Sequence, residues 1–334
     1  MEHASRVSGG HRFAFGGVAA PEKVGRDLRL AALLIFTVSA LPGATYFVTV
    51  AGLGGSPEYD TQFTQWAMAI DRELHANGPN VHLETLSGSS ATRQHVREVL
   101  ARVASELQPE DAFALFLIGH GTFDGTDYKF NVPGPDITAS ELASLLNRIP
   151  ARRQLVVNMT SASGASLSAL ARKNRIVITA TKSGNEKNAT VFARYWVDAL
   201  RDPAADSDKN GAISALEAYR YAERKTAAYF ETEKMLATEH AILSDTGTAN
   251  GVRDPKPENG QGLLAAAFPI MRSQTDAAKD VKPEKQRLLA KKEELEAKID
   301  RLKYEKAAFG ADEYKQQLTA LLLELARTQA EIDR

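Results

Sequence analysis

The residues that decide the fold are Ala112–Gly121, AFALFLIGHG, and Gln154–Gly164, QLVVNMTSASG. Each stretch begins with an apolar run and ends in glycine or small polar residues. An apolar run without alternation is typical of a strand that is buried on both faces of a parallel sheet. We therefore expect both runs to be central strands. The residues that follow them then lie at the carboxyl edge of the sheet, where ligands of such sheets bind.

Strands and helices are predicted to alternate on either side of these two runs. Further strands are expected at Tyr46–Leu53, Val81–Leu86 and Arg175–Ala180. Apolar residues at helical spacing predict helices at Gln62–Ala76, Ala91–Leu107 with Ser90 as its N-cap, Ala139–Leu146 and Thr190–Leu200. This alternation predicts the α/β class, with a mainly parallel sheet and helices on both faces.

Composition excludes several classes of protein. The chain has 334 residues, of which 43% are hydrophobic and 25% charged, as in an ordinary globular protein. Lysine and arginine number 41 against 42 acidic residues, so no basic excess predicts a nucleic-acid partner. The absence of cysteine excludes disulfides, thiolate metal sites and a cysteine nucleophile.

The N-terminal residues 1–44 are expected to be an extension followed by an export signal. Basic residues at Arg26 and Arg29 precede the apolar run Leu30–Ala40, and small residues follow up to Ala44. This order is typical of a secretory signal peptide, and the run is shorter than the ~20 residues of a membrane span. We expect a secreted or periplasmic protein that begins near Thr45 and has no membrane span after cleavage. The alternative is a buried first strand or helix.

Two segments after the central strands carry a resemblance to a known family. One is Gly119-His120-Gly121, and the other is Ser161-Ala162-Ser163-Gly164. This ordered set resembles the caspase-like cysteine peptidases, and most closely the legumain family with its bacterial relatives. Thr181–Gly184 and Thr238–Ala241 also look like segments of that family, so the resemblance covers residues 45–250. It implies a caspase-like three-layer α/β/α sandwich.

The resemblance also implies roles for particular residues. His120 matches the general base of the family, and Ser161 falls at the position of its nucleophilic cysteine. Backbone N–H groups of Gly121 and Ser161 would form the oxyanion hole. Two further positions depart from the family: Gly54 stands where active legumains have the asparagine that orients the histidine, and Asp60 stands where they have a pocket arginine.

These departures favour a decayed site, although other interpretations stay open. A serine hydroxyl has almost no anionic form near neutral pH, so Ser161 could attack a carbonyl only with His120 in hydrogen-bond reach. His120 could instead be a turn histidine, and Thr160, Ser161 and Ser163 could cap the next helix. Asp124 and Asp127 are expected to be acids of a surface loop.

Residues 206–217, DSDKNGAISALE, match the EF-hand calcium loop at every conserved position. The expected ligands of Ca²⁺ are the side chains of Asp206, Asp208, Asn210, Ser214 and Glu217 and the backbone carbonyl of Ala212. A helix over Ala215–Thr226 follows the loop, and no clear helix enters it directly. A lone loop of this kind predicts a structural calcium ion. An Asx-rich turn that caps the following helix is the alternative.

The last part of the chain, residues 273–334, is predicted to be a linker and a helical hairpin or short coiled coil. Charge-rich helices are expected at Glu284–Ala308 and Asp312–Asp333. Their expected apolar faces consist of Leu288, Leu295, Ile299 and Leu302 in the first helix, and Leu318, Leu322, Leu325 and Ile332 in the second. Two such faces favour homo-oligomerisation or partner binding.

Three functions remain open at this level. The first is an exported pseudopeptidase that binds protein or peptide through residues 45–272. The second is a hydrolase with Ser161 as nucleophile and His120 as base. The third is a calcium-stabilised scaffold of the cell envelope without a peptide cleft.

Overall fold

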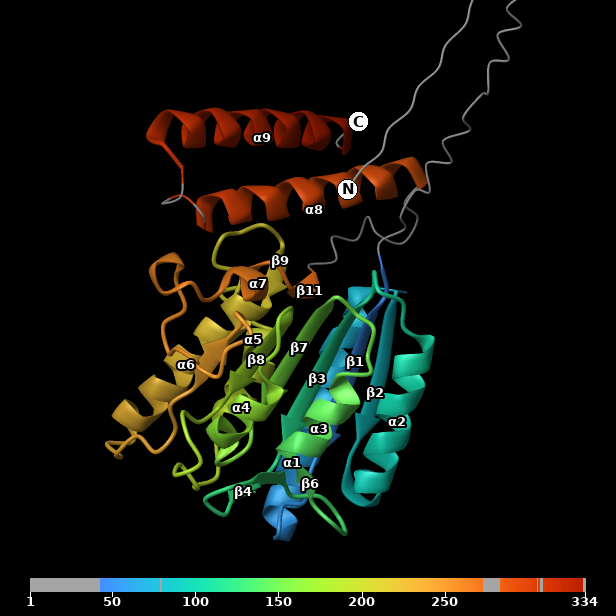
Figure 1. Ribbon diagram of the computed structural model, residues 1–334, viewed down its shortest axis with the longest axis vertical. Coiled ribbons are helices and arrows are strands. Elements are labelled where there is room, and N and C mark those ends of the chain that lie inside the picture. The colour runs from blue at the N-terminus through green and yellow to red at the C-terminus, as the bar shows by residue number, and fades with distance from the viewer. Residues whose placement is uncertain (1–42, 79, 273–282, 305, 307–308, 333–334) are drawn as a thin grey trace, which may run out of the picture. The chain divides into compact units, whose positions relative to one another are not determined.

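A parallel β-sheet organises the protein. The computed structural model describes residues 43–272 except 79, and 283–332 except 305, 307 and 308 (Figure 1). Within these residues the main sheet has six strands in the order β10-β8-β7-β3-β1-β2. The strands are β1 (Thr45–Ala51), β2 (Val81–Leu86), β3 (Ala112–Ile118), β7 (Arg153–Asn158), β8 (Arg175–Thr179) and β10 (Ile242–Ser244). Only the edge strand β10 pairs antiparallel. The predicted α/β class with a mainly parallel sheet is confirmed.

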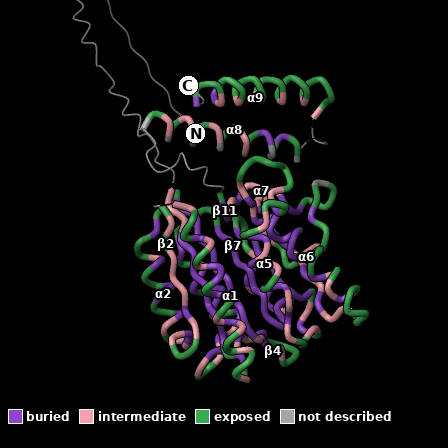
Figure 2. Tube along the Cα trace, turned by 180° about the vertical axis from the view of Figure 1, so that it is seen from behind, coloured by how far each residue is buried: buried purple, intermediate pink, exposed green. Residues whose placement is uncertain are grey.

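Helices cover both faces of this sheet. They are α1 (Pro57–Leu74), α5 (Phe192–Ala199) and α6 (Ala215–Thr232) on one face, and α2 (Arg93–Glu106), α3 (Ala139–Leu146) and α4 (Leu167–Leu170) on the other. Strand β3 divides its side chains between the two layers, with Phe116 in the first core and Leu117 in the second. Every residue of β3 is buried, and Figure 2 shows the neighbouring strands buried as well. The uninterrupted apolar run AFALFLI follows from this two-sided burial.

Local capping explains where two helices begin. Helix α1 begins at Pro57, earlier than expected, because the Ser56 hydroxyl accepts a hydrogen bond from the Tyr59 N–H at 3.4 Å and proline suits the first helical turn. The N-cap predicted for α2 was wrong. Thr92, and not Ser90, accepts the hydrogen bond from the His95 N–H at 3.2 Å. Ser90 instead closes the preceding 3₁₀ turn, Gly88–Ser90, by bonding to Ser87.

Short elements outside the main sheet complete this part of the chain. Strands β4 (Gly121–Phe123), β5 (Tyr128–Phe130) and β6 (Ile137–Thr138) form a three-stranded sheet directly after β3. Strand β9 (Ala212–Ser214) pairs antiparallel with β11 (Pro269–Arg272). Helix α7 (Leu263–Ala266) and 3₁₀ turns at His75–Asn77, Ser163–Ser166 and Pro257–Asn259 lie in the connections. None of the helices in the described ranges is long and apolar enough to cross a membrane.

The C-terminal residues form the predicted pair of long helices, α8 (Pro283–Tyr304) and α9 (Ala311–Ile332), which pack against each other. Leu295, Ile299 and Leu302 of α8 are buried, as is Ile332 of α9. The prediction for Leu322 was wrong, because its side chain is 46% exposed. The inward positions of α9 are spaced three and four residues apart through Leu318, Leu321 and Leu325, so position 322 faces outward.

Candidate functional site

The pairing of β3 with β7 brings the two predicted site segments to one edge of the sheet. The strands are parallel, and Leu117 lies opposite Asn158 at their carboxyl ends. His120 follows β3 by two residues, and Ser161 follows β7 by three. The structure therefore places Gly121 directly against Ser161, in hydrogen-bond contact.

Ser161 is held by the backbone of Gly121 through two hydrogen bonds. The Ser161 Oγ accepts from the Gly121 N–H at 3.1 Å and donates to the Gly121 carbonyl, also at 3.1 Å. The residue is only 2% exposed. Both the hydroxyl and the backbone N–H that would serve an oxyanion hole are thus engaged with each other. Within the described part of the chain, no hydrogen bond joins this hydroxyl to a side chain that could act as its general base.

The imidazole of His120 faces a different set of neighbours. Its ring edges contact the rings of Tyr59 and Phe63, with centroids 5.0 and 5.2 Å away. The backbone carbonyl of Gly54 acts on the ring as a hydrogen-bond acceptor. Burial lowers the pKa of His120 below its usual value, and the Gly54 carbonyl and the negative charge of Asp60 oppose that shift. The neutral imidazole is therefore favoured, and among the described residues no hydrogen bond joins the ring to Ser161.

The backbone of Gly54, in the loop after β1, is held by Asp60. The Asp60 Oδ1 accepts a hydrogen bond from the Gly54 N–H at 2.6 Å. A Cβ on Gly54 would come within 2.3 Å of the Asp60 backbone nitrogen. Asp60 lies in the first turn of α1, where a carboxylate also suits the helix dipole. Asp60 thus holds the loop that faces His120.

A buried polar network surrounds Ser161. The hydroxyl of Tyr128 lies 2.6 Å from Thr160 Oγ1 and donates to Asn158 Oδ1 at 3.2 Å. Ser163 Oγ accepts from the Thr181 N–H at 3.1 Å. The expectation that these serines and threonines cap the next helix was wrong, since neither the 3₁₀ turn Ser163–Ser166 nor α4 has a side-chain cap. Their hydroxyls instead link β7 to the neighbouring strands.

A second cluster of ionisable groups lies on the segments that follow β8 and precede β10. Glu186 accepts from His240 Nδ1 at 2.5 Å and from the Lys182 N–H at 2.9 Å, and its backbone carbonyl accepts from the Ala162 N–H at 2.7 Å. Glu239 is buried and accepts from the N–H groups of Val191 and Phe192, both at 2.8 Å. Burial, with the nearby charge of Glu186, raises the pKa of Glu239 to about 7.

This cluster could be found only in part from the sequence. Thr238–Ala241 is noticeable as a family-like segment, but nothing near Glu186 indicates a partner 54 residues away. Asp124 behaves as the loop acid that was expected. Its carboxylate accepts from the N–H groups of Thr126 and Asp127 and pairs with Lys129 at 3.0 Å. The backbone N–H bonds hold the pKa of Asp124 well below its usual value.

The predicted calcium loop brings three of its acidic ligands together. One carboxylate oxygen each from Asp206, Asp208 and Glu217 lies within 4.8 Å of the others. Glu217 is 8% exposed and lies in the first turn of α6, where it also completes a capping box with Ser214. The remaining side chains point within the loop: Asn210 Oδ1 accepts from the Ala212 N–H at 2.8 Å. These three carboxylates are oxygen donors of the kind that calcium prefers, and they are three of the roughly six to eight oxygen ligands that the ion takes.

The loop has structural support on both sides. The strand of the loop, β9, pairs with β11, with Ile213 opposite Met271. Ile213 is buried in the core beside α6. Helix α5 ends at Ala199, before the loop, so the entering helix is separated from Asp206 by several residues. Strand β9 of this loop therefore pairs with β11, and not with the strand of a second loop of the same kind.

Comparisons with known proteins give little further information. No family model matches the chain, and no curated protein matches it. Among solved structures, a structural-genomics protein from Geobacter sulfurreducens is similar, with a TM-score of 0.42 and 13% identity. That match covers 66% of this chain and 97% of the other.

The environment of His120 predicts a measurable titration. We expect its pKa in the folded protein to lie below the ordinary value, because burial disfavours the imidazolium. Asp60→Asn should lower it further, since the amide keeps an acceptor for the Gly54 N–H and removes the negative charge. Histidine ring signals in NMR spectra recorded across pH provide the measurement, with His82 as the internal control. An unchanged His120 pKa in Asp60→Asn would contradict this assignment.

Glu239 predicts a pH-dependent stability. Its pKa is 4.5 ordinarily and about 7 in the fold, so the neutral form stabilises the protein fully below pH 4.5. That contribution is lost as pH rises through about 7, by up to about 3 kcal/mol. Urea unfolding at several pH values should show that the free energy of unfolding falls with rising pH in wild type, and that it falls less steeply in Glu239→Gln. Glu258→Gln, at an exposed acid, is the control, and equal slopes in all three proteins would refute the prediction.

Proposed function

We propose that this chain is an inactive homologue of the caspase-like peptidases, of the legumain-like group, which acts by binding protein or peptide. The observation that carries the proposal is the state of Ser161. Its hydroxyl is buried and bonded in both directions to the Gly121 backbone, while the His120 ring lies against Gly54, Tyr59 and Phe63. A nucleophilic serine needs its base within hydrogen-bond reach.

The arrangement of the sheet supports a caspase-like sandwich. Five parallel strands and one antiparallel edge strand lie between two helical layers. Gly-His-Gly and the Ser161 segment follow adjacent central strands, β3 and β7. For the alternative, an active hydrolase, the Ser161 hydroxyl would have to break both hydrogen bonds to Gly121, and the His120 ring would have to rotate away from Gly54. Among the described residues, no hydrogen bond joins Ser161 to His120.

Covalent labelling tests the proposal. Wild type, Ser161→Ala, His120→Ala and the exposed control Ser144→Ala would be treated with diisopropyl fluorophosphate and weighed by mass spectrometry. We expect no adduct on any of them, with a known serine hydrolase in the same reaction as the positive control. An adduct that is present in wild type and Ser144→Ala, and lost in the other two, would establish an activated serine and overturn the proposal.

A single thiol gives an independent measure of the same site. The chain has no cysteine, so Ser161→Cys and the exposed Ser144→Cys each carry one reactive group. We expect iodoacetamide to alkylate folded Ser161→Cys at least about tenfold more slowly than folded Ser144→Cys, because burial limits access. Equal alkylation rates of the two unfolded variants in urea would show that the difference between them arises from the folded structure. Faster alkylation of Ser161→Cys in the folded state would mean an accessible, activated position.

We also propose that the loop at residues 206–217 binds a structural calcium ion. The support is the convergence of Asp206, Asp208 and Glu217. Lone extracytoplasmic loops bind with a Kd of ~10⁻⁴–10⁻³ M, and calcium at tenfold excess over Kd stabilises a fold by about 1.4 kcal/mol. The ion would anchor the beginning of α6 to β9 and would take no part in chemistry at Ser161.

Calcium should therefore raise the unfolding temperature of wild type by a few degrees, and magnesium should not. Asp208→Asn, at an exposed position of the loop, should remove this shift, and without calcium it should have the same fold as wild type. Asp124→Asn, in a different acidic turn, should keep the full shift. An identical calcium response in wild type and Asp208→Asn would exclude this loop as the site.

Export and assembly complete the proposed function. The predicted signal at residues 26–44 lies outside the described residues except for Gly43 and Ala44, and β1 begins at Thr45, the expected start of the mature protein. We propose a secreted or periplasmic location on that basis. The helices α8 and α9 would support homo-oligomerisation or bind a partner protein.

A further inference from the structure

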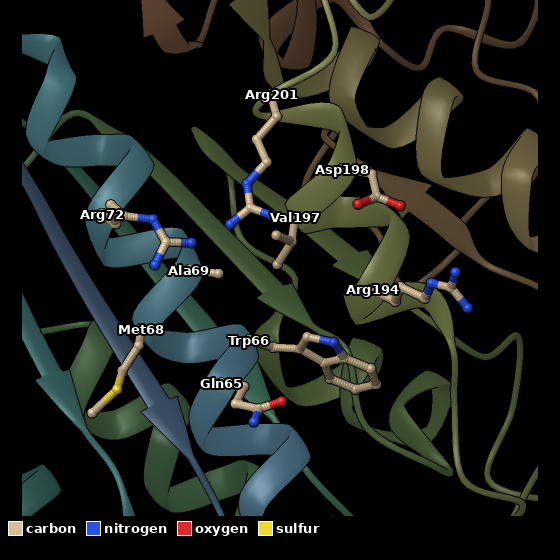
Figure 3. A pocket seen from close by; sticks show the side chains of 9 residues that line it. All are labelled: Gln65, Trp66, Met68, Ala69, Arg72, Arg194, Val197, Asp198 and Arg201. Atoms are coloured by element: carbon tan, nitrogen blue, oxygen red, sulfur yellow. The ribbon is translucent and has the colours of Figure 1, made fainter.

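A hollow of about 390 Å³ lies between α1 and α5 (Figure 3), and neither His120 nor Ser161 lines it. Four of its lining residues form a mainly apolar surface: Trp66, Met68, Ala69 and Val197. Trp66 is partly buried and packs against Phe63, while Met68 is 57% exposed. Tryptophan, methionine and arginine are residue types that are enriched on surfaces that bind other proteins.

The rim of this hollow carries an excess of positive charge. Arg72, Arg194 and Arg201 line it, together with Asp198 and Gln65. Arg72 and Arg201 share one carboxylate oxygen of Glu73, at 3.5 and 2.9 Å. Arg194 lies over the ring of Tyr195 at 5.4 Å, and no carboxylate of the described residues is within ion-pair distance of it. A guanidinium group without an ion-pair partner in the described part of the chain, such as that of Arg194, can donate hydrogen bonds to a carboxylate of a partner protein.

The dimensions of the hollow fit a helix. On α1, Trp66 and Arg72 are six residues apart, or about 9 Å along the helix axis. On the other side of the hollow, Arg194 lies near the beginning of α5 and Arg201 lies two residues beyond its end. Figure 3 shows Trp66 at one end of the hollow and the guanidinium groups of Arg72 and Arg201 at the other. A partner helix presents residues i, i+3, i+4 and i+7 over the same length when it docks in a groove.

We propose that the groove between α1 and α5 binds an acidic amphipathic helix of a partner protein. Apolar side chains of that helix would contact Trp66, Met68 and Val197. Its carboxylates would pair with Arg72 and Arg194. The proposal does not depend on the state of Ser161, because none of the lining residues belongs to the strand-end site.

Methionine NMR tests this directly. The chain has five methionines, of which Met68 lines the groove and Met235, 46% exposed, is an internal control. The full chain, labelled at the methionine methyl groups, would be titrated to about 1 mM with a helical peptide of about 15 residues. The peptide carries leucine at i, i+3, i+4 and i+7 and glutamate on both flanks. We expect the Met68 signal to shift in a saturable way and the Met235 signal to stay in place.

Charge variants provide the matched controls. Arg72→Glu with Arg194→Glu should weaken binding at least about tenfold, whereas Arg148→Glu, at an exposed position beside the other face of the sheet, should not change it. A peptide of the same composition in scrambled order, and one with lysine in place of glutamate, should leave Met68 unshifted.

Four results would overturn the proposal. They are no Met68 shift at 1 mM, an equal shift with the scrambled or lysine peptide, an unchanged affinity in the double variant, and a Met68 shift that depends on protein concentration alone. The last would mean that a second copy of the chain occupies the groove. Labelling of Ser161 is read out separately, so failure of one proposal does not imply failure of the other.

Discussion

The parallel pairing of β3 with β7 is the constraint on which the rest of the structure depends. Both strands are buried, and β3 sends Phe116 to one core and Leu117 to the other. Because side chains alternate along a strand, a shift of one residue would exchange the two faces and misplace every core contact. The register is therefore strongly determined. It also determines that the residues after the two strands, Gly121 and Ser161, come into contact at the edge of the sheet.

The contact between Gly121 and Ser161 leaves no room for a side chain at position 121, and it determines the hydrogen bonds of the Ser161 hydroxyl. A Cβ on Gly121 would lie 2.5 Å from the Ser161 carbonyl and 2.5 Å from the ring of Tyr128. With glycine there, the Ser161 hydroxyl satisfies both the N–H and the carbonyl of Gly121. A buried polar group must be hydrogen-bonded to avoid a large desolvation cost. The hydroxyl therefore fulfils a structural need of the backbone, which opposes its release as a nucleophile.

The polar groups around this edge form one connected region rather than a free active site. Asp60 holds Gly54, which faces His120, and the Glu186 carbonyl holds Ala162, next to Ser161. Ala162 has a φ of 54°, a left-handed conformation that costs energy for alanine. This strained residue directly follows Ser161, and among the described residues no hydrogen bond joins Ser161 to His120. The proposed binding groove between α1 and α5 is lined by other residues than this edge.

Short-range patterns were enough to predict much of the fold. The apolar runs of β3 and β7 identified the central strands, because burial on both faces needs an unbroken apolar sequence. The EF-hand spacing indicated that the carboxylates of Asp206, Asp208 and Glu217 converge, since all three lie in one short loop. By contrast, Leu322 was assigned to the wrong face of α9, and Ser90 to a cap that Thr92 provides. In these two cases neighbouring residues have similar propensities, and packing or one hydrogen bond selects between them.

The sequence by itself determined the fold class, the two segments that meet at the sheet edge, and the absence of cysteine. It could not determine which atoms those segments would bring into contact. Only the tertiary structure decided that Ser161 bonds to Gly121 rather than to His120, that Asp60 holds the backbone of Gly54, and that Glu186 meets His240 across 54 residues. The physical reason is that hydrogen bonds depend on the directions of particular groups to within tenths of an ångström. Those directions are set by the packing of the whole sheet and its helices.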